Sequence, residues 1–124
     1  MAQITIRRFE KADDGRDFEK GRFDLVTIGG LTVGRAAYEP GWKWSVHVKP
    51  IAKTSSCRVE HVGLVGLVVS GRAMVVMDDG EDVLLKPGDL FAIPPGHDSW
   101  VVGDEAYVSL HLLGADAYAK RAAE

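Results

Sequence analysis

The chain has 124 residues, of which 46% are hydrophobic and 27% charged, and its formal net charge is −3. This length fits one compact domain, and this composition excludes disorder, collagen and coiled coil. The sequence has no basic cluster of the kind that binds nucleic acid, and no apolar run reaches the roughly 20 residues of a membrane helix. The single cysteine, Cys57, excludes an intrachain disulfide and is compatible with a reducing compartment, so we expect a cytoplasmic protein.

Alternating and β-branched apolar runs dominate the chain, whereas helical periodicity is almost absent. We expect strands at Ile4–Arg8, Phe23–Ile28, Leu31–Tyr38, Trp42–Lys49, Arg58–Val69, Arg72–Met77, Asp82–Leu85, Asp89–Ile93, Ser99–Val102 and Ala106–Leu113. Turn residues such as Pro-Gly and Asp-Gly fill nearly every gap between them. Many short strands separated by turns are typical of a β-sandwich or barrel, so the sequence predicts an all-β fold.

Two segments lack the strand pattern. Lys11–Lys20 is polar and predicts a loop or a helical turn, whereas Ala115–Glu124 contains good helix formers and predicts a short C-terminal helix over about 115–123. The chain shows no linker and no domain-scale repeat. We therefore expect one domain over 1–124, with N-terminal strands over 3–37 and a motif-bearing barrel over about 38–113.

A small tandem repeat lies inside one predicted strand, where Val62-Gly63-Leu64 is followed directly by Val65-Gly66-Leu67. Glycine in the interior of a strand usually marks a bulge or a close approach of two backbones. We therefore expect a local irregularity of the strand at this repeat.

Two glycine motifs indicate the fold more specifically. The segment from Gly88 to Gly96 has the pattern G-x5-P-x-G, and Gly41 is followed after five residues by His47. These residues match the second motif and the start of the first motif of the cupins, and Ser70-Gly71 fits the end of the first. The chain thus resembles small single-domain cupins over roughly Tyr38 to Leu112. The resemblance implies a jelly roll, or double-stranded β-helix, whose interior opens into a ligand pocket, and it also implies a homodimer.

The resemblance also directs attention to metal ligands, which cupins take as two histidines and a glutamate from the first motif and one histidine from the second. His47 occupies the first histidine position, but Lys49 replaces the second. The glutamate position is Leu64, or His61 if one copy of the tandem repeat is discounted. In the second motif, Ser99 stands at the histidine position and His97 lies two residues earlier.

A rearranged ligand set can still be assembled from these residues. It consists of His61, His97 and His47, with Glu60 and His111 as alternates. Three imidazoles suit a divalent transition metal such as Zn, Fe, Ni, Mn or Cu, and the sequence does not choose among them.

Each of these residues also has a structural interpretation. His47 alternates with apolar residues that include Trp42 and Trp44, so it faces outward if the tryptophans face the core or a dimer interface. His61 shares a predicted face with apolar residues, so it is either a ligand or a hydrogen-bonded core residue. His97 either contacts a ligand or caps the turn after Gly96. His111 is otherwise a partly exposed strand residue, and Glu60 an exposed residue before a strand.

The expected ligand pocket is lined by Lys49, Phe91, Ser99, Trp100 and Tyr107. The departures from the cupin ligand set favour a small-molecule-binding protein, acting as a binding or sensory and regulatory module. The alternative is a metal-dependent enzyme, a dioxygenase or an isomerase, that acts on a small organic substrate. A storage-type or structural jelly roll is a third interpretation.

Overall fold

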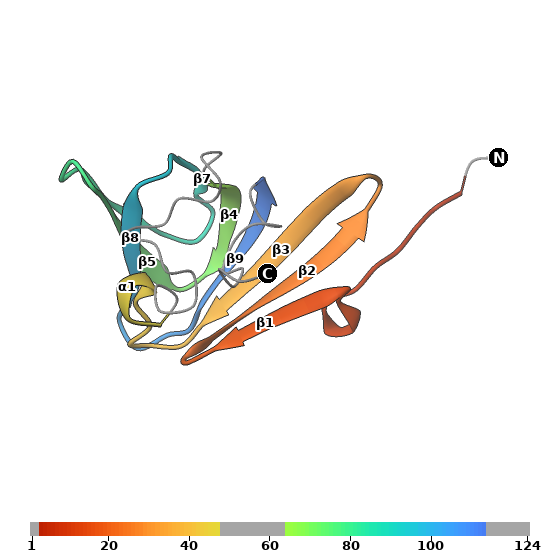
Figure 1. Cartoon of the computed structure of the whole chain (residues 1–124), viewed down its shortest axis with the longest axis horizontal. Coiled ribbons are helices and arrows are strands. Elements are labelled where there is room, and N and C mark those ends of the chain that lie inside the picture. Colours follow the sequence, from red (N-terminus) through yellow and green to blue (C-terminus); the bar gives the residue numbers. More distant parts are fainter. Residues whose placement is uncertain (1–2, 48–63, 114–124) are drawn as a thin grey trace, which may run out of the picture.

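The computed structural model describes residues 3–47 and 64–113 of the protein, and strands make up most of this part (Figure 1). The strands are β1 (Asp14–Phe18), β2 (Gly21–Ile28), β3 (Leu31–Tyr38), β4 (Leu64–Ser70), β5 (Arg72–Met77), β6 (Asp82–Leu85), β7 (Leu90–Ile93), β8 (His97–Val102) and β9 (Tyr107–Leu113). A 3-10 turn, η1 (Phe9–Lys11), precedes β1, and one helical turn, α1 (Trp44–His47), follows β3. None of the described helices is long and apolar enough to span a membrane. The predicted all-β fold is confirmed.

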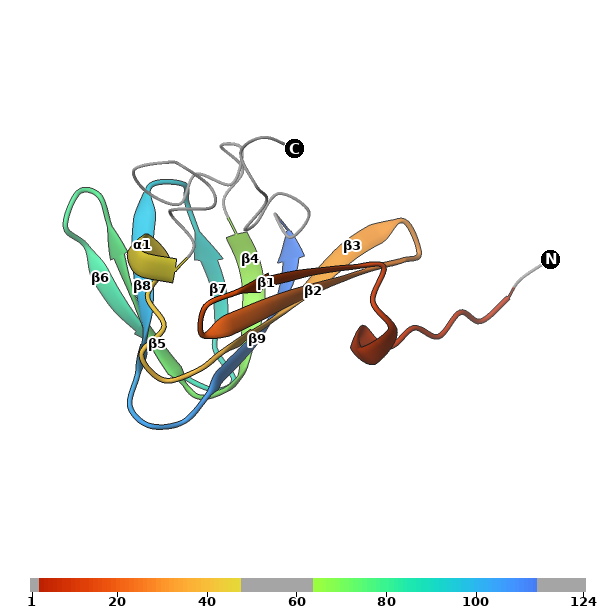
Figure 2. The same ribbon diagram turned by 60° about the horizontal axis from the view of Figure 1, so that its bottom comes forward.

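The strands form two antiparallel sheets. One has the order β1-β2-β3-β9-β4-β7 and the other the order β6-β5-β8. Figures 1 and 2 show the β9-β4-β7 part facing the smaller sheet, while β1, β2 and β3 extend away to one side. From β6 onward successive strands alternate between the sheets, which is the double-sheet arrangement of a jelly roll.

The core lies between the two sheets and follows the alternation of side chains along each strand. Phe23 of β2 and Tyr38 of β3 meet Phe91 and Tyr107 from the other strands of the large sheet, and Trp42 lies in the same cluster. Val75 and Val101 cover them from the small sheet. The larger sheet therefore contributes most of the aromatic residues of the interior.

Strand β1 corrects the expectation that Lys11–Lys20 forms a loop or a helical turn. This segment lacks apolar alternation, but its central residues Asp14–Phe18 pair with β2. Phe18 packs against the core, and the guanidinium of Arg22 on β2 contacts the Asp17 carboxylate, with 2.7 Å between Nη1 and Oδ1. This polar edge strand thus joins the sheet through its backbone ladder, one cross-strand ion pair and one apolar side chain.

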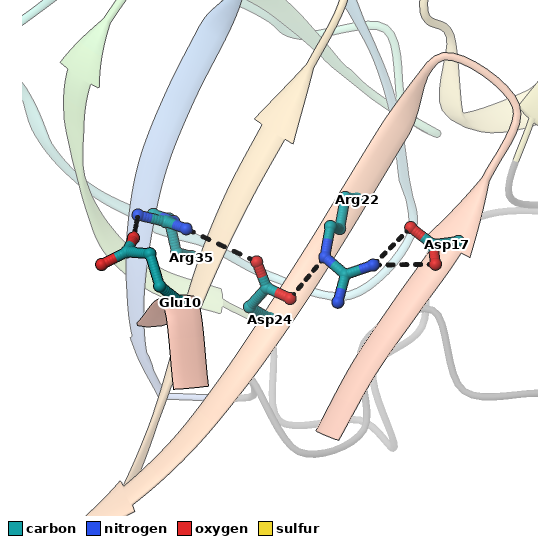
Figure 3. Close-up of polar contacts among 5 residues, drawn as sticks. All are labelled: Glu10, Asp17, Arg22, Asp24 and Arg35. Carbon is teal, nitrogen blue, oxygen red and sulfur yellow. Dashed lines mark hydrogen bonds and ion pairs between the residues drawn. The ribbon is translucent and has the colours of Figure 1, made fainter. Parts of the chain in front are cut away.

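This ion pair continues as an alternating series of charges across β1, β2 and β3 (Figure 3). The buried Asp24 carboxylate lies 2.6 Å from Nε of Arg22 and 3.6 Å from Nη2 of Arg35. Arg35 in turn places Nη1 2.9 Å from Glu10 of η1. The series ties the N-terminal turn and three strands together through side-chain charges.

The predicted strand Ile4–Arg8 is not a strand in the structure. Residues 3–8 form an extended arm that leads away from the sheets (Figures 1 and 2), and Ile4 and Ile6 are 89% and 78% exposed. Arg7 fixes the base of the arm by donating to the Thr27 carbonyl over 2.8 Å and to Asp13 over 2.6 Å. The alternating pattern has no neighbouring strand in the described chain, so it produces extended backbone without a ladder.

The predicted strand Trp42–Lys49 is also corrected, because its described part turns into α1. Trp42 and Trp44 are both buried in the core, and only Lys43 makes a single bridge, to Trp100. The Asp98 carboxylate accepts a hydrogen bond from the Ser45 backbone nitrogen over 3.0 Å. That carboxylate satisfies a donor at the start of the turn, which the strand pattern does not take into account.

The other predicted strands agree with the structure within about two residues wherever the structure describes them. Three have the predicted bounds, namely β3, β5 and β6. Residues 58–63 and the predicted C-terminal helix over 115–123 lie outside the described residues.

The tandem repeat behaves as predicted at its second glycine. The register of β4 with β9 shifts between Val65 and Gly66. A Cβ atom at Gly66 would collide with the carbonyl oxygen of Leu110 and with the ring of Phe91. The glycine therefore marks both a bulge and a close approach of two backbones.

Candidate functional site

A cavity of about 30 Å³ lies between the two sheets. Polar side chains are frequent in its wall, in particular His97, His111, Ser99, Tyr38 and Tyr107. The volume is that of one or two water molecules. The cavity can thus hold the polar end of a ligand but not a whole substrate.

His97 starts β8, directly after the Pro94-Pro95-Gly96 bend, and is 2% exposed. Gly96 has a φ of 90°, which a residue with a side chain rarely adopts, and the turn brings His97 into the interior. Nδ1 of His97 lies 3.0 Å from the Pro94 carbonyl oxygen. Because a carbonyl only accepts, Nδ1 carries the proton and Nε2 keeps its lone pair.

Burial of the His97 ring lowers its pKa, although the Pro94 carbonyl and the nearby Asp98 act in the opposite direction. The neutral imidazole is therefore favoured near pH 7. A neutral ring with an available Nε2 can accept a hydrogen bond or ligate a metal.

His111 lies on β9 and faces the same cavity. Its Nε2 is 3.1 Å from the Ser109 hydroxyl, and the rings of Phe23 and Phe91 contact it edge-on at centroid distances of 5.0 and 5.8 Å. Burial, with a smaller contribution from His97, lowers the pKa of His111 to about 3. The site thus contains two imidazoles that are both neutral near pH 7.

Aromatic side chains close one side of the cavity. The rings of Tyr38 and Trp42 stack at a centroid distance of 3.9 Å, and Tyr38 also stacks on Tyr107 at 6.0 Å. Burial raises the pKa of Tyr107 to about 12, so its phenol stays protonated. The indole nitrogen of Trp42 is buried, and no hydrogen-bond acceptor is within its reach among the residues that the structure describes.

A second, larger depression of about 320 Å³ adjoins this cavity, and we refer to it as the edge groove. It lies where β6, at the edge of the small sheet, and β7, at the edge of the large sheet, come together. Its lining residues are Val75, Met77, Glu81, Val83, Leu85, Asp89, Leu90, Phe91, Ala92, Ile93 and Pro94. Four of them, Val75, Leu85, Phe91 and Ile93, also line the inner cavity, so the two spaces share a wall.

The predicted site residues fall into three groups. The structure brings His97 and the alternate ligand His111 together in the interior, with Phe91, Ser99 and Tyr107 in the same wall. Trp100 lies on the opposite face of β8 from Ser99, where Lys43 Nζ is 5.0 Å from its ring centroid, and it is not among the cavity residues. The remaining residues are not placed: His61, Glu60 and Lys49 lie outside the described residues, and so does the side chain of His47.

Sequence reasoning missed Tyr38 and Trp42 as cavity residues, and Met77, Val83 and Ala92 in the edge groove. Tyr38 ends β3, whose residues do not alternate clearly between polar and apolar, so no signal in the sequence indicated its inward orientation. The groove residues carried no such signal, because the groove depends on how the edges of two sheets approach each other.

The metal that the cupin resemblance implies needs at least three protein ligands. Among the described residues no group of three candidate ligands comes together, and the cavity provides two imidazoles. Moreover, Nε2 of His111 is within hydrogen-bond distance of Ser109. The described residues alone therefore do not fit a metal, and a centre at His97 would need ligands from His47, His61 or Glu60.

Comparison with solved structures identifies the fold. The chain is similar to a protein of unknown function from Rhizobium leguminosarum bv. viciae, with 20% identity, a TM-score of 0.59 and coverage of 89% of this chain and 95% of that one. A Klebsiella pneumoniae protein with a double-stranded β-helix domain matches at 20% identity, a TM-score of 0.58 and 88% coverage of each chain. A cupin-like protein from Thermotoga maritima matches at 20% identity, a TM-score of 0.52 and coverage of 89% and 79%.

No protein-family model and no curated protein matches the chain. The structural matches establish the fold: the chain has the cupin, double-stranded β-helix fold, as the two glycine motifs predicted. Because this fold hosts many unrelated functions, the function has to be inferred from the residues of the site.

Proposed function

We propose that the protein binds a small, mainly apolar molecule in the edge groove. The observation that carries this proposal is the shared wall of groove and inner cavity, formed by Val75, Leu85, Phe91 and Ile93. It places the larger depression next to a small chamber whose wall includes His97, His111 and Ser99. The groove volume of about 320 Å³ lies at the lower end of the range of about 300–1,000 Å³ for small-molecule sites, so the ligand is small.

The groove wall supports an apolar ligand. Leu90 and Val83 are 73% and 50% exposed although they are large apolar residues on adjoining edge strands. Covering such side chains removes apolar surface from water, which favours binding by about 25 cal/mol for each Å² buried. Exposed apolar surface of this kind, next to a depression, is typical of a binding groove.

The inner cavity, on the other side of the shared wall, contains hydrogen-bonding groups of its own. Trp42 offers a buried indole N–H that lacks an acceptor within the described chain, and a buried donor without an acceptor is costly. His97 adds an Nε2 lone pair on a neutral ring. An uncharged hydroxyl or carbonyl oxygen in this chamber could accept a hydrogen bond from the Trp42 indole, and a hydroxyl could also donate one to Nε2 of His97.

A metal-dependent enzyme, a dioxygenase or an isomerase, is the second candidate function. The observation that favours it is the orientation of His97, whose Nδ1 is bonded to a backbone carbonyl in the manner of metal-binding histidines. This function requires further ligands from His47, His61 or Glu60. Without them the neutral imidazoles serve in binding only.

A titration of 2-phenylethanol into protein with labelled valine, leucine and isoleucine methyl groups tests the binding proposal. We expect saturable shifts of the Val83, Leu90 and Ile93 methyl signals and none at Leu31, which lies at the distant end of β3. The variant Ala92→Trp places an indole in the groove and should abolish these shifts. Leu31→Trp introduces the same side chain at another exposed position, outside the groove, and should not change the shifts. Wild-type protein without saturable shifts in the groove would refute the proposal, provided that the methyl spectrum shows a folded protein.

A further inference from the structure

The charges in the wall of the edge groove specify the ligand further, and we infer that the groove selects a small apolar cation, in the simplest case a primary ammonium on an apolar body. This inference rests on the proposed function, because it concerns the same groove. It adds the sign of the ligand charge, which neither the fold nor the apolar wall determines.

Only two charged side chains are among the described residues that line the groove, and both are carboxylates. Glu81 directly precedes β6, and Asp89 directly precedes β7, so each strand that borders the groove contributes one of them. The nearest basic residue in the sequence, Lys86, is exposed and does not belong to the lining. A cation in the groove thus meets negative charge from both strands.

The two carboxylates are held on ordered backbone. The carbonyl of Glu81 accepts a hydrogen bond from the Met77 nitrogen over 2.7 Å, and its own nitrogen donates to Asp79 Oδ1 over 3.1 Å. The Asp89 carboxylate accepts from the Lys86 nitrogen over 2.9 Å. These contacts fix the Asp89 carboxylate and the backbone that carries Glu81 before a ligand arrives.

The turn between β5 and β6 adds to the negative potential. It carries Asp78, Asp79 and Glu81, and Asp82 follows as the first residue of β6; the sequence from residue 73 to residue 85 contains no Lys, Arg or His. Charges of one sign beside a low-dielectric apolar surface attract ligands of the opposite sign and repel ligands of the same sign. The groove therefore discriminates against an apolar carboxylate of the same shape.

Three probes of nearly equal shape separate the charge from the apolar contact: 2-phenylethylamine, 2-phenylethanol and 3-phenylpropanoate. Titrations of the full chain at pH 7 and low ionic strength, followed at the Val83 and Leu90 methyl signals, give the three dissociation constants. We expect the amine to bind roughly threefold to fivefold more tightly than the alcohol, the usual size of an exposed charge interaction, and the carboxylate to bind more weakly than the alcohol.

Glu81→Gln removes one negative charge from the groove and should reduce the difference between the dissociation constants of the amine and the alcohol. Glu105→Gln, the same change at an exposed residue in the turn between β8 and β9, should leave the difference unchanged. Raising the salt concentration to 0.5 M should weaken the binding of the amine but not that of the alcohol, because salt screens exposed charges.

The outcomes distinguish the two proposals. Equal affinities of amine and carboxylate, or equal effects of Glu81→Gln and Glu105→Gln, would overturn the inferred charge preference while the alcohol still demonstrates the groove site. If none of the three probes shifts the groove signals, both the binding proposal and the charge preference are refuted.

Discussion

Ser109 and His111 lie two residues apart on β9 and point to the same side of the sheet, with 3.1 Å between the Ser109 hydroxyl oxygen and Nε2 of His111. Both residues are buried, and the rings of Phe23 and Phe91 contact the imidazole on its other sides. A hydroxyl partner and aromatic neighbours favour the neutral imidazole, since burial disfavours its charged form.

The two interior histidines are therefore expected to resist protonation. In an NMR titration of the ring C–H signals, His111 should show no midpoint between pH 5 and 8, because its pKa is about 3. His97 should titrate below the ordinary histidine value of 6.5, because burial lowers its pKa. A midpoint near 6.5 for His111 would contradict the buried, neutral state that we describe.

The same shift makes the stability of the protein depend on pH. As the pH falls below about 6.5, His111 takes up a proton in the unfolded state but not in the folded state, so the free energy of unfolding decreases until the pH approaches 3. One such proton contributes a slope of up to about 1.4 kcal/mol per pH unit. Urea unfolding at several pH values between 7 and 4 should show a shallower decrease for His111→Leu than for the wild type. Parallel profiles of the two proteins would show that His111 is not the responsible group.

The Asp24 carboxylate, which joins Arg22 and Arg35, is predicted to stabilise the β1-β2-β3 part of the sheet. Its side chain is 8% exposed, whereas Asp17 at the end of the same series is 72% exposed. Asp24→Asn leaves two guanidinium groups without this charge, and we expect a loss of about 1–3 kcal/mol in the free energy of unfolding, because the arginines are partly exposed. The matched change Asp17→Asn should cost less than about 1 kcal/mol. If urea denaturation gave the same loss of unfolding free energy for Asp24→Asn and Asp17→Asn, the burial of Asp24 would not contribute to stability.

Gly66 is predicted to tolerate no side chain, even the smallest. A Cβ atom there would meet the Leu110 carbonyl oxygen and the Phe91 ring, and the backbone atom cannot move without disturbing the pairing of β4 with β9. Gly66→Ala should destabilise the protein by about 1–3 kcal/mol, as overpacking of a core usually does. Gly80→Ala provides a comparison, since the turn at Gly80 has open space around it and only the positive φ opposes a side chain. Thermal unfolding of both variants should show the larger loss for Gly66→Ala.

The sequence predicted the fold well where the local pattern and the tertiary structure agree. The alternation of Arg22, Phe23, Asp24 and Leu25 in β2 and the turn glycines around β7 were sufficient, because Phe23 and Leu25 belong to the buried core. It failed at β1, which is polar and joins the sheet through its backbone ladder and the Asp17–Arg22 ion pair, and at α1, where the distant Asp98 carboxylate accepts from Ser45. It also missed the edge groove, because the groove arises from the relative position of β6 and β7. The expected homodimer and cytoplasmic location stay predictions.

The predicted metal set, His61, His97 and His47, is the part of the site that depends on residues outside the described structure. If it holds a transition metal, protein incubated with Fe(II), Zn(II), Ni(II) or Mn(II) and then dialysed should retain about one equivalent of one of these ions by elemental analysis. His97→Ala and His61→Ala should lose it, because each removes one of three ligands. His111→Ala should retain it if His111 is only an alternate ligand, as its contact with the Ser109 hydroxyl suggests. A wild-type protein that retains none of these ions would exclude this histidine set, and the neutral His97 and His111 would then act only as hydrogen-bonding groups beside the ligand.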